Sequence, residues 1–176
     1  MTEPARIELP LSGWSMRRWR ERDQAALQRA ADDERIARWM SDTWPSPYTA
    51  ADAAWWVGEG AAHGSTWALC LHDVPMGGLG AHPQGGFLRC NVEVGWWLAP
   101  AQWGQGVVPL AAAELLRQTW CDPEVTRVFA PIHAGNGPSM RVAAKLGMTL
   151  EAVQRRSAIK RGVVIDRHVF ALIRTP

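Results

Sequence analysis

Two glycines separated by one residue, Gly104 and Gly106, lie between a segment with strand character and a segment with helical character. Alternating residues predict the strand over 91–98, and the apolar run predicts a helix over 107–120. Glycine lets the backbone approach a bound group closely, and the first amides of a helix have no acceptor within it. These amides also lie at the positive end of the helix dipole. The turn therefore predicts a seat for a phosphate, although Gly-x-Gly can also be plain turn chemistry.

The spacing of these glycines does not fit the two common nucleotide motifs. No third glycine follows Gly106 at the distance that the dinucleotide fingerprint requires, and no Gly-Lys-Ser/Thr follows as in the nucleotide P-loop. We therefore expect a phosphate-bearing ligand of another kind.

A second segment, residues 136–148, reads Asn-Gly-Pro-Ser-Met-Arg-Val-Ala-Ala-Lys-Leu-Gly-Met. Together with Glu93-x-Gly95-Trp-Trp-Leu98-x-Pro100 and Trp103-Gly-Gln-Gly106, it resembles the GNAT N-acetyltransferase superfamily, and its RimJ/RimL-like branch in particular. The resemblance covers nearly the whole chain. It implies a mixed α/β GNAT fold, with a mostly antiparallel twisted sheet of about seven strands. That sheet would be splayed between its two central parallel strands and flanked by about four helices.

The resemblance implies acetyl-CoA as the acyl donor. Its pyrophosphate would lie on the amides of the turn, and its pantetheine arm would pair with the backbone near Trp97 and Leu98. Two departures stand out: Trp103 occupies a position where much of the superfamily has Arg or Gln, although this branch often has an aromatic residue there, and Val108 replaces the usual Gly or Ala. The implied donor-binding residues are Trp97, Leu98, Trp103, Gly104, Gln105, Gly106, Val107, Val108, Asn136 and Ser139.

Acetylation of an amine requires removal of a proton from the amine and stabilisation of an oxyanion. Glu93 on the predicted central strand is the candidate base, acting through a water; the alternative is a solvated or salt-bridged carboxylate. Glu151 and His133 are the other candidate bases, and His133 has an ordinary pKa of about 6.5. A backbone N–H near Trp96 or Trp97 is the candidate oxyanion donor.

The thiolate must also leave. Many members of the superfamily protonate it with a tyrosine, but the single tyrosine of this chain is Tyr48, in a Pro-rich loop far from that position in the sequence. The resemblance implies Ser139 in this role. A thiol with a pKa of about 8.5 is already a fair leaving group, so a hydroxyl could suffice. The alternative role of Ser139 is that of a helix N-cap.

The remaining patterns predict the elements that carry these groups. Asp23 and Thr49 are predicted helix N-caps, and Gly147 a helix C-cap. The basic run from Arg17 to Arg22 is interpreted as a solvated strand face. The predicted strands cover 6–20 (with a turn at 12–13), 65–71, 74–81, 87–98, 125–134, 150–159 and 163–173, and the predicted helices cover 23–31, 33–40, 49–58, 107–120 and 139–146.

Length and composition set the class of protein. A chain of 176 residues with 47% hydrophobic content favours one globular domain, 1–176. A net charge of +2 argues against a nucleic-acid binder. The three cysteines are far apart, which predicts no metal site and a reduced, cytoplasmic location. No apolar run approaches the roughly 20 residues of a membrane helix. A homodimer is implied by the resemblance alone.

The leading hypothesis is an acetyltransferase that moves an acetyl group from acetyl-CoA to a primary amine by direct attack in a ternary complex. The acceptor could be a protein N-terminus or a small amine. Three alternatives remain: a larger acyl donor such as succinyl-CoA, a non-catalytic acyl-CoA-binding module, and an α/β domain without a ligand.

Overall fold

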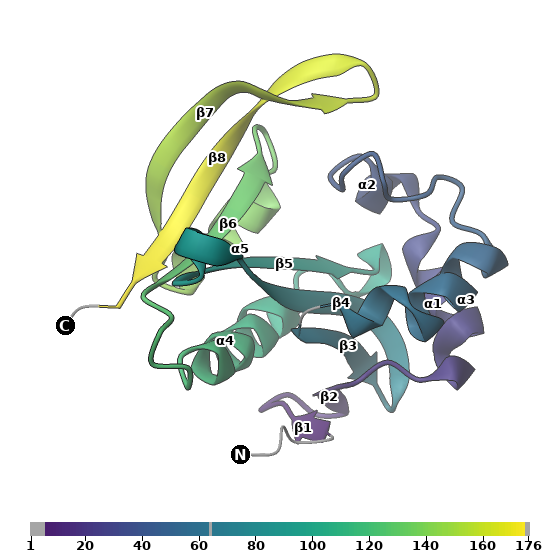
Figure 1. Cartoon of the computed structure of the whole chain (residues 1–176). Coiled ribbons are helices and arrows are strands. Elements are labelled where there is room, and N and C mark those ends of the chain that lie inside the picture. The colour runs from purple at the N-terminus through teal and green to yellow at the C-terminus, as the bar shows by residue number, and fades with distance from the viewer. Residues whose placement is uncertain (1–5, 64, 175–176) are drawn as a thin grey trace. The chain divides into compact units, whose positions relative to one another are not determined.

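The structure, a computed structural model, describes residues 6–63 and 65–174 (Figure 1). Within these ranges eight strands form one mixed sheet in the order β1-β2-β3-β4-β5-β6-β8-β7. The strands are β1 (Arg6–Glu8), β2 (Trp14–Arg17), β3 (Ser65–Leu71), β4 (Val74–Pro83), β5 (Asn91–Leu98), β6 (Arg127–His133), β7 (Thr149–Lys160) and β8 (Val163–Ile173). The α-helices are α1 (Gln24–Ala31), α2 (Glu34–Ala37), α3 (Ala50–Gly58), α4 (Val107–Thr119) and α5 (Gly137–Lys145). The predicted mixed α/β fold is confirmed; its eight strands and five α-helices compare with the approximate numbers, seven and four, that the resemblance implies.

The chain divides into two compact units, which we describe separately. The first comprises the residues up to Gly80 together with Trp96–Ala112, and the second comprises Ala81–Gly95 together with the residues from Ala113 onward. In the described ranges no helix is both long and apolar enough to cross a membrane. The single domain that the sequence predicts stays a prediction.

The strands of the first unit form an antiparallel ladder. β2 pairs with β1 and with β3, so that Met16 lies opposite Ile7 on one side and Leu69 on the other. β3 is buried along almost its whole length, on both faces: the side chains from Trp67 to Cys70 are apolar, and the buried Thr66 hydroxyl donates to the carbonyl oxygen of Ala61. The predicted turn before β2 is present, and Gly13 takes a positive φ of 76° there.

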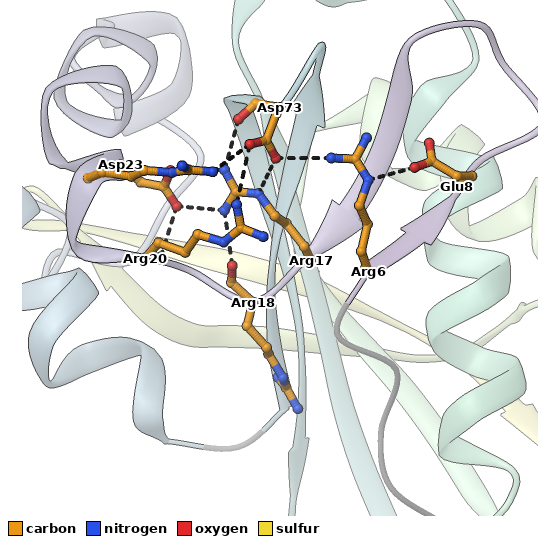
Figure 2. Close-up of polar contacts among 8 residues, drawn as sticks. Arg6, Glu8, Arg17, Arg18, Arg20, Asp23 and Asp73 are labelled. Atoms are coloured by element: carbon orange, nitrogen blue, oxygen red, sulfur yellow. Dashed lines mark hydrogen bonds and ion pairs between the residues drawn. The ribbon is translucent and has the colours of Figure 1, made fainter.

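Within the basic run, Arg20 and Arg22 are exposed, as a solvated face predicts, but Arg17 is buried in a network of ion pairs (Figure 2). Arg17 is fully buried and donates through Nη1 and Nη2 to both carboxylate oxygens of Asp23, at 2.7 and 2.9 Å. Its Nε donates to the Asp73 carboxylate at 2.7 Å, and its remaining two N–H groups reach the carbonyl oxygens of Arg18 and Asp73. All five guanidinium donors are thus satisfied, which explains how a charged side chain can occupy the core.

The helices of the first unit correct two predictions. Asp23 precedes α1, but its side chain does not cap that helix, because it accepts from Arg17 and from the backbone N–H of Arg20. The helix predicted over 33–40 is shorter: α2 ends at Ala37, and the chain continues to Met40 through i→i+3 turns. Thr49 does cap α3, in a capping box with Asp52, as predicted.

The second unit contains the predicted parallel pair. Residues Asn91–Glu93 of β5 pair in parallel with Arg127–Phe129 of β6, and this ladder comprises three residue pairs. β6 alternates between buried and half-buried residues, as predicted, with Val128, Ala130 and Ile132 buried. It pairs along its full length with β8, which forms the predicted hairpin with β7.

One predicted strand boundary in this unit is wrong. Of the two ranges predicted for this strand, 91–98 is that of β5, whereas 87–98 begins too early, because Gly86–Leu88 form a 3-10 turn. Gly86 has a φ of 61°, which an extended strand does not allow. The Phe87 side chain is exposed, so the apolar residue at this position does not indicate a buried strand.

Candidate functional site

The turn before α4 leaves its backbone amides open. Gly104 and Gly106 have positive φ values of 81° and 76°, and a Cβ built on either would meet nothing within 4 Å. Among the described residues, the amides of Gly104, Gln105 and Gly106 find no hydrogen-bond acceptor. Val107, the first residue of α4, is buried and anchors the helix directly behind the turn. Consecutive free amides in such a turn at the start of a helix form a concavity suited to an anion.

Trp103 is held in place at the entrance to this turn. Its indole Nε1–H donates to the carbonyl oxygen of Leu98 at 2.7 Å. The residue is 48% exposed, and the guanidinium carbon of Arg35 lies 5.9 Å from the ring centroid. The aromatic residue at this position is therefore fixed to the end of β5.

Trp97, a predicted pantetheine contact, belongs to an aromatic cluster of the first unit. The ring of Trp44 lies 5.2 Å from that of Trp97 and 5.2 Å from that of Tyr48. The ring of Trp19 meets that of Trp56 edge-on at 6.2 Å. These rings pack on an apolar core formed by Leu27, Ala31, Tyr48 and Ala53. The Pro-rich loop, distant in sequence, therefore lies in the same cluster as Trp97.

The glycines of β4 allow Trp97 to approach closely, Gly77 its backbone and Gly78 its indole ring. A Cβ on Gly77 would lie 2.5 Å from the Trp97 carbonyl oxygen, and a Cβ on Gly78 would lie 2.8 Å from its indole nitrogen. Contacts this short cannot be relieved by a side-chain rotation alone when the neighbour is a backbone atom. The Gly-rich sequence of β4 is thus a packing requirement of β5.

We expect Gly77→Ala to lower the free energy of unfolding by about 1–3 kcal/mol, because overpacking forces a backbone shift. Urea unfolding measures the loss. Gly95→Ala is the matched control: Gly95 also lies in a strand, but a Cβ there meets nothing within 4 Å. Equal midpoints for the two variants would contradict the close approach at Gly77.

In the second unit, Glu93 is half-buried on β5 and lies opposite Phe129 in the parallel ladder. Within the described residues its carboxylate has no ion-pair or hydrogen-bond partner. The salt-bridged alternative for this residue therefore finds no partner among the described side chains. A half-buried carboxylate without a protein partner is free to accept a proton from a bound group or a water.

The helix N-cap is Asn136, not Ser139. The Asn136 side-chain oxygen accepts the backbone N–H of Ser139 at 3.3 Å, and Pro138 lies in the first turn of α5. Asn followed by Pro in the first helical turn was a signal available in the sequence. Because Ser139 takes part in the cap through its backbone alone, its hydroxyl is left without a partner among the described residues.

Comparison with known families decides the identity of this arrangement. The sequence profile described as "Acetyltransferase (GNAT) domain" matches residues 15–149, which contain the turn, Glu93 and Ser139. The chain belongs to the GNAT acetyltransferase family. A search of curated proteins finds no match.

Solved structures show the same GNAT fold. An acetyltransferase of the GNAT family from Bacillus anthracis has a TM-score of 0.82 at 19% identity, covering 95% of this chain and 98% of that one. RimJ from Mycobacterium smegmatis, in complex with CoA-disulfide, has 0.80 at 23%, covering 96% and 85%. A Salmonella typhimurium acetyltransferase that modifies the N-terminal serine of ribosomal protein L7/L12 has 0.79 at 15%, covering 94% and 97%. The predicted likeness to the RimJ/RimL-like branch is confirmed at the level of the fold.

Of the two other candidate bases, Glu151 is engaged in an ion pair of the second unit. Arg127 donates to both carboxylate oxygens of Glu151 and holds the pKa of that carboxyl below its ordinary value. His133 is the last residue of β6, and its backbone lies opposite that of Arg167 in the antiparallel ladder with β8. A carboxylate in an ion pair is a weaker base, so Glu151 is the poorer candidate.

Tyr48 is buried in the aromatic cluster, and burial, followed by the nearby Asp52 carboxylate, raises its pKa to about 12. Its hydroxyl therefore stays protonated at neutral pH. Among the described residues no group of three or more His, Cys, Asp or Glu side chains could hold a metal ion. Cys70, Cys90 and Cys121 are free thiols.

Proposed function

We propose that this GNAT protein is an acyl-CoA-dependent N-acetyltransferase that transfers the acetyl group of acetyl-CoA to a primary amine. The observation that carries the proposal is the set of open amides at Gly104–Gly106 before α4, in a chain that belongs to an acetyltransferase family. Exposed backbone amides at the start of a 13-residue helix can donate hydrogen bonds to the oxygens of a diphosphate, and the helix dipole favours its negative charge.

The donor would be held mainly by backbone groups. Its diphosphate would accept hydrogen bonds from the amides of Gly104, Gln105, Gly106, Val107 and Val108; Pro109, in the first turn, has no N–H to offer. Its pantetheine arm would pair with the backbone at Trp97 and Leu98, and Trp103 and Asn136 are the further candidate donor-binding residues. RimJ and RimL were solved with CoA species, which supports a CoA donor for the fold.

The chemistry would be direct attack. Glu93, through a water, would take a proton from the acceptor ammonium, and the free amine nitrogen would form a bond to the thioester carbon. A backbone N–H near Trp96 or Trp97 would stabilise the resulting oxyanion. When the carbon–sulfur bond breaks, the Ser139 hydroxyl would pass its proton to the leaving thiolate and take up the second proton that the former amine nitrogen loses as the amide forms. No metal takes part in this proposal.

The acceptor class is open between a protein N-terminus and a small amine. Structures of the same fold include both kinds of ligand: one protein modifies the N-terminal serine of a ribosomal protein, and another, a microcin C7 self-immunity acetyltransferase, was solved with acetyl-CoA and AMP.

We also propose one domain over 1–176, a cytoplasmic location and a possible homodimer. The single tyrosine of the chain, Tyr48, is far in sequence from the position where many family members protonate the thiolate, and Val108 replaces the usual Gly or Ala of the turn. Both departures support a non-catalytic acyl-CoA-binding module as the second candidate.

Binding and turnover are tested in one series. Acetyl-CoA at 100 times its Kd is expected to stabilise the protein by about 2.7 kcal/mol, detected as a rise in Tm. Incubation with acetyl-CoA and a panel of amines and N-terminal peptides should then release free CoA thiol, and succinyl-CoA tests the larger donor. A Tm rise without thiol release would favour the non-catalytic module. No Tm rise at millimolar acetyl-CoA would overturn the proposed function.

A further inference from the structure

The turn of the first unit contains no cation of its own. Residues 99–108 include neither Lys nor Arg, and Trp103 occupies the position where much of the superfamily has Arg or Gln. Neutral amides alone must otherwise balance the charge of a diphosphate. Charge-assisted hydrogen bonds to phosphate are about twice as strong as neutral ones, so a nearby guanidinium would contribute substantially.

Arg35 of α2 brings a guanidinium to this turn from a separate element of the same unit. Its guanidinium carbon lies 5.9 Å from the centroid of the Trp103 ring, within the range of a cation–π contact. Trp103 is itself fixed by the hydrogen bond from its indole to the Leu98 carbonyl, and Gly104 follows it directly. The guanidinium thus lies near a fixed ring that directly precedes the open amides.

The Arg35 side chain retains hydrogen-bonding capacity. It is 64% exposed, and its Nε and Nη2 donate to the two carboxylate oxygens of Asp33 at 3.0 and 2.7 Å. A guanidinium has five N–H donors, so three remain without a partner among the described residues. Asp33 also accepts the backbone N–H of Arg35 as the N-cap of α2, which orients the start of this short helix.

We propose that Arg35 binds a phosphate group of the acyl-CoA donor, supplying from α2 the cation that the turn lacks. The inference rests on the proposed function, because it needs CoA at the turn. The planar guanidinium can pair with two phosphate oxygens while its face stays on the Trp103 ring. Trp103 then acts as the support that positions Arg35, which gives a physical reason for an aromatic residue at that place. Both the diphosphate and the 3′-phosphate of CoA present the required chemistry.

The test measures Kd for CoA, 3′-dephospho-CoA and phosphate-free pantetheine by calorimetry with wild-type protein and Arg35→Ala. We expect Arg35→Ala to weaken CoA binding about ten- to hundredfold, the loss of a charged hydrogen bond, and to leave pantetheine binding unchanged. A loss that disappears with 3′-dephospho-CoA assigns the contact to the 3′-phosphate, and a loss that persists assigns it to the diphosphate. Arg35→Lys should recover part of the affinity, since it restores charge without the planar fork.

Arg38→Ala is the matched control. Arg38 is also exposed, follows α2 directly, and its guanidinium carbon lies 4.7 Å from the ring of Trp39 instead of Trp103. This variant should bind CoA within about twofold of wild type, because exposed charges away from the ligand contribute little. Equal weakening by both variants would reduce the effect to general electrostatics and overturn the proposal.

Asp33→Asn tests the same contact in the opposite direction. Asparagine is also a good N-cap, so α2 should persist, while the carboxylate that competes for Arg35 is removed. CoA binding should tighten several-fold, and the gain should vanish in the Asp33→Asn/Arg35→Ala double variant. If wild type binds CoA and Arg35→Ala binds it equally well, the Arg35 inference is wrong and the proposed function stands. If wild type does not bind CoA, both are wrong.

Discussion

Glu93→Gln is expected to lower kcat of amine acetylation by about 10²–10⁴-fold, the usual contribution of a general base. The amide has the size of the carboxylate but cannot accept a proton from the attacking amine. Because Glu93 is half-buried and its carboxylate has no protein partner among the described residues, the substitution breaks no ion pair that would otherwise destabilise the fold. The Kd for acetyl-CoA and the Tm should therefore stay close to the wild-type values, which separates a catalytic loss from unfolding.

A pH–rate profile and a matched carboxylate sharpen this test. If Glu93 is the base, the acidic limb of the kcat/KM profile should disappear in Glu93→Gln. Glu124→Gln is the control, since Glu124 is a two-thirds exposed carboxylate 3.4 Å from Arg89, in the same unit. It should leave kcat unchanged. Wild-type turnover by Glu93→Gln, with an acceptor in hand, would show that another group removes the proton.

Ser139→Ala accompanies this experiment as an independent probe of the thiolate. Asn136 caps α5 through the backbone N–H of residue 139, which alanine retains, so no loss of stability is expected. A decrease in kcat at unchanged Tm would then report on the hydroxyl alone. If Ser139→Ala keeps full activity, the leaving thiolate needs no proton from this residue.

The elements that were predicted correctly depend on local patterns. Thr49 and Asp52 lie three residues apart and form the capping box of α3, and the alternation of β6 appears directly in its buried residues. The hairpin of β7 and β8 surrounds the predicted turn at Arg161-Gly162, where both residues have positive φ. In each case the deciding interaction is made within a few residues, so the sequence contains it.

The features that the sequence could not predict depend on residues brought together by the fold. The contact between Arg35 and Trp103 joins α2 to the turn before α4, and the pairing of Trp44 with Trp97 joins the Pro-rich loop to β5. No local period encodes such a contact. The family resemblance implied Ser139 as a site residue, but only the fold shows that its backbone N–H takes part in the cap while its hydroxyl has no partner among the described residues.

Arg17 is the clearest example, because four arginines within six residues suggest solvent, while one of them is buried. β2 carries Arg17 into the sheet, and the turn between β3 and β4, where His72 and Asp73 both have positive φ, presents the Asp73 carboxylate to it. Asp23, in the segment before α1, supplies the second carboxylate to which Arg17 donates. The ion pair thus joins three segments of the first unit, which is why its effect on stability should be large.

Arg17→Met is expected to lower the free energy of unfolding by about 3–5 kcal/mol, the usual loss when one partner of a buried ion pair is removed. The Asp23 side chain is only 2% exposed and would lose both guanidinium donors, keeping the backbone N–H of Arg20. Urea unfolding at neutral pH measures the loss. The double variant Arg17→Met/Asp23→Leu should recover much of it, since no uncompensated charge then remains in the core.

Arg20→Met distinguishes burial from charge. Arg20 also reaches the Asp73 carboxylate, at 3.3 Å, but its side chain is 41% exposed, so the expected loss is below about 1 kcal/mol. Arg17 and its neighbours hold the pKa of Asp73 below the ordinary value, so the stabilisation from Asp73 is present above pH ~4 and is lost as the pH falls through the lowered pKa. Asp73→Asn should therefore flatten the acid side of the stability profile. If Arg17→Met and Arg20→Met unfold at the same urea concentration, the buried ion pair does not hold these three segments together.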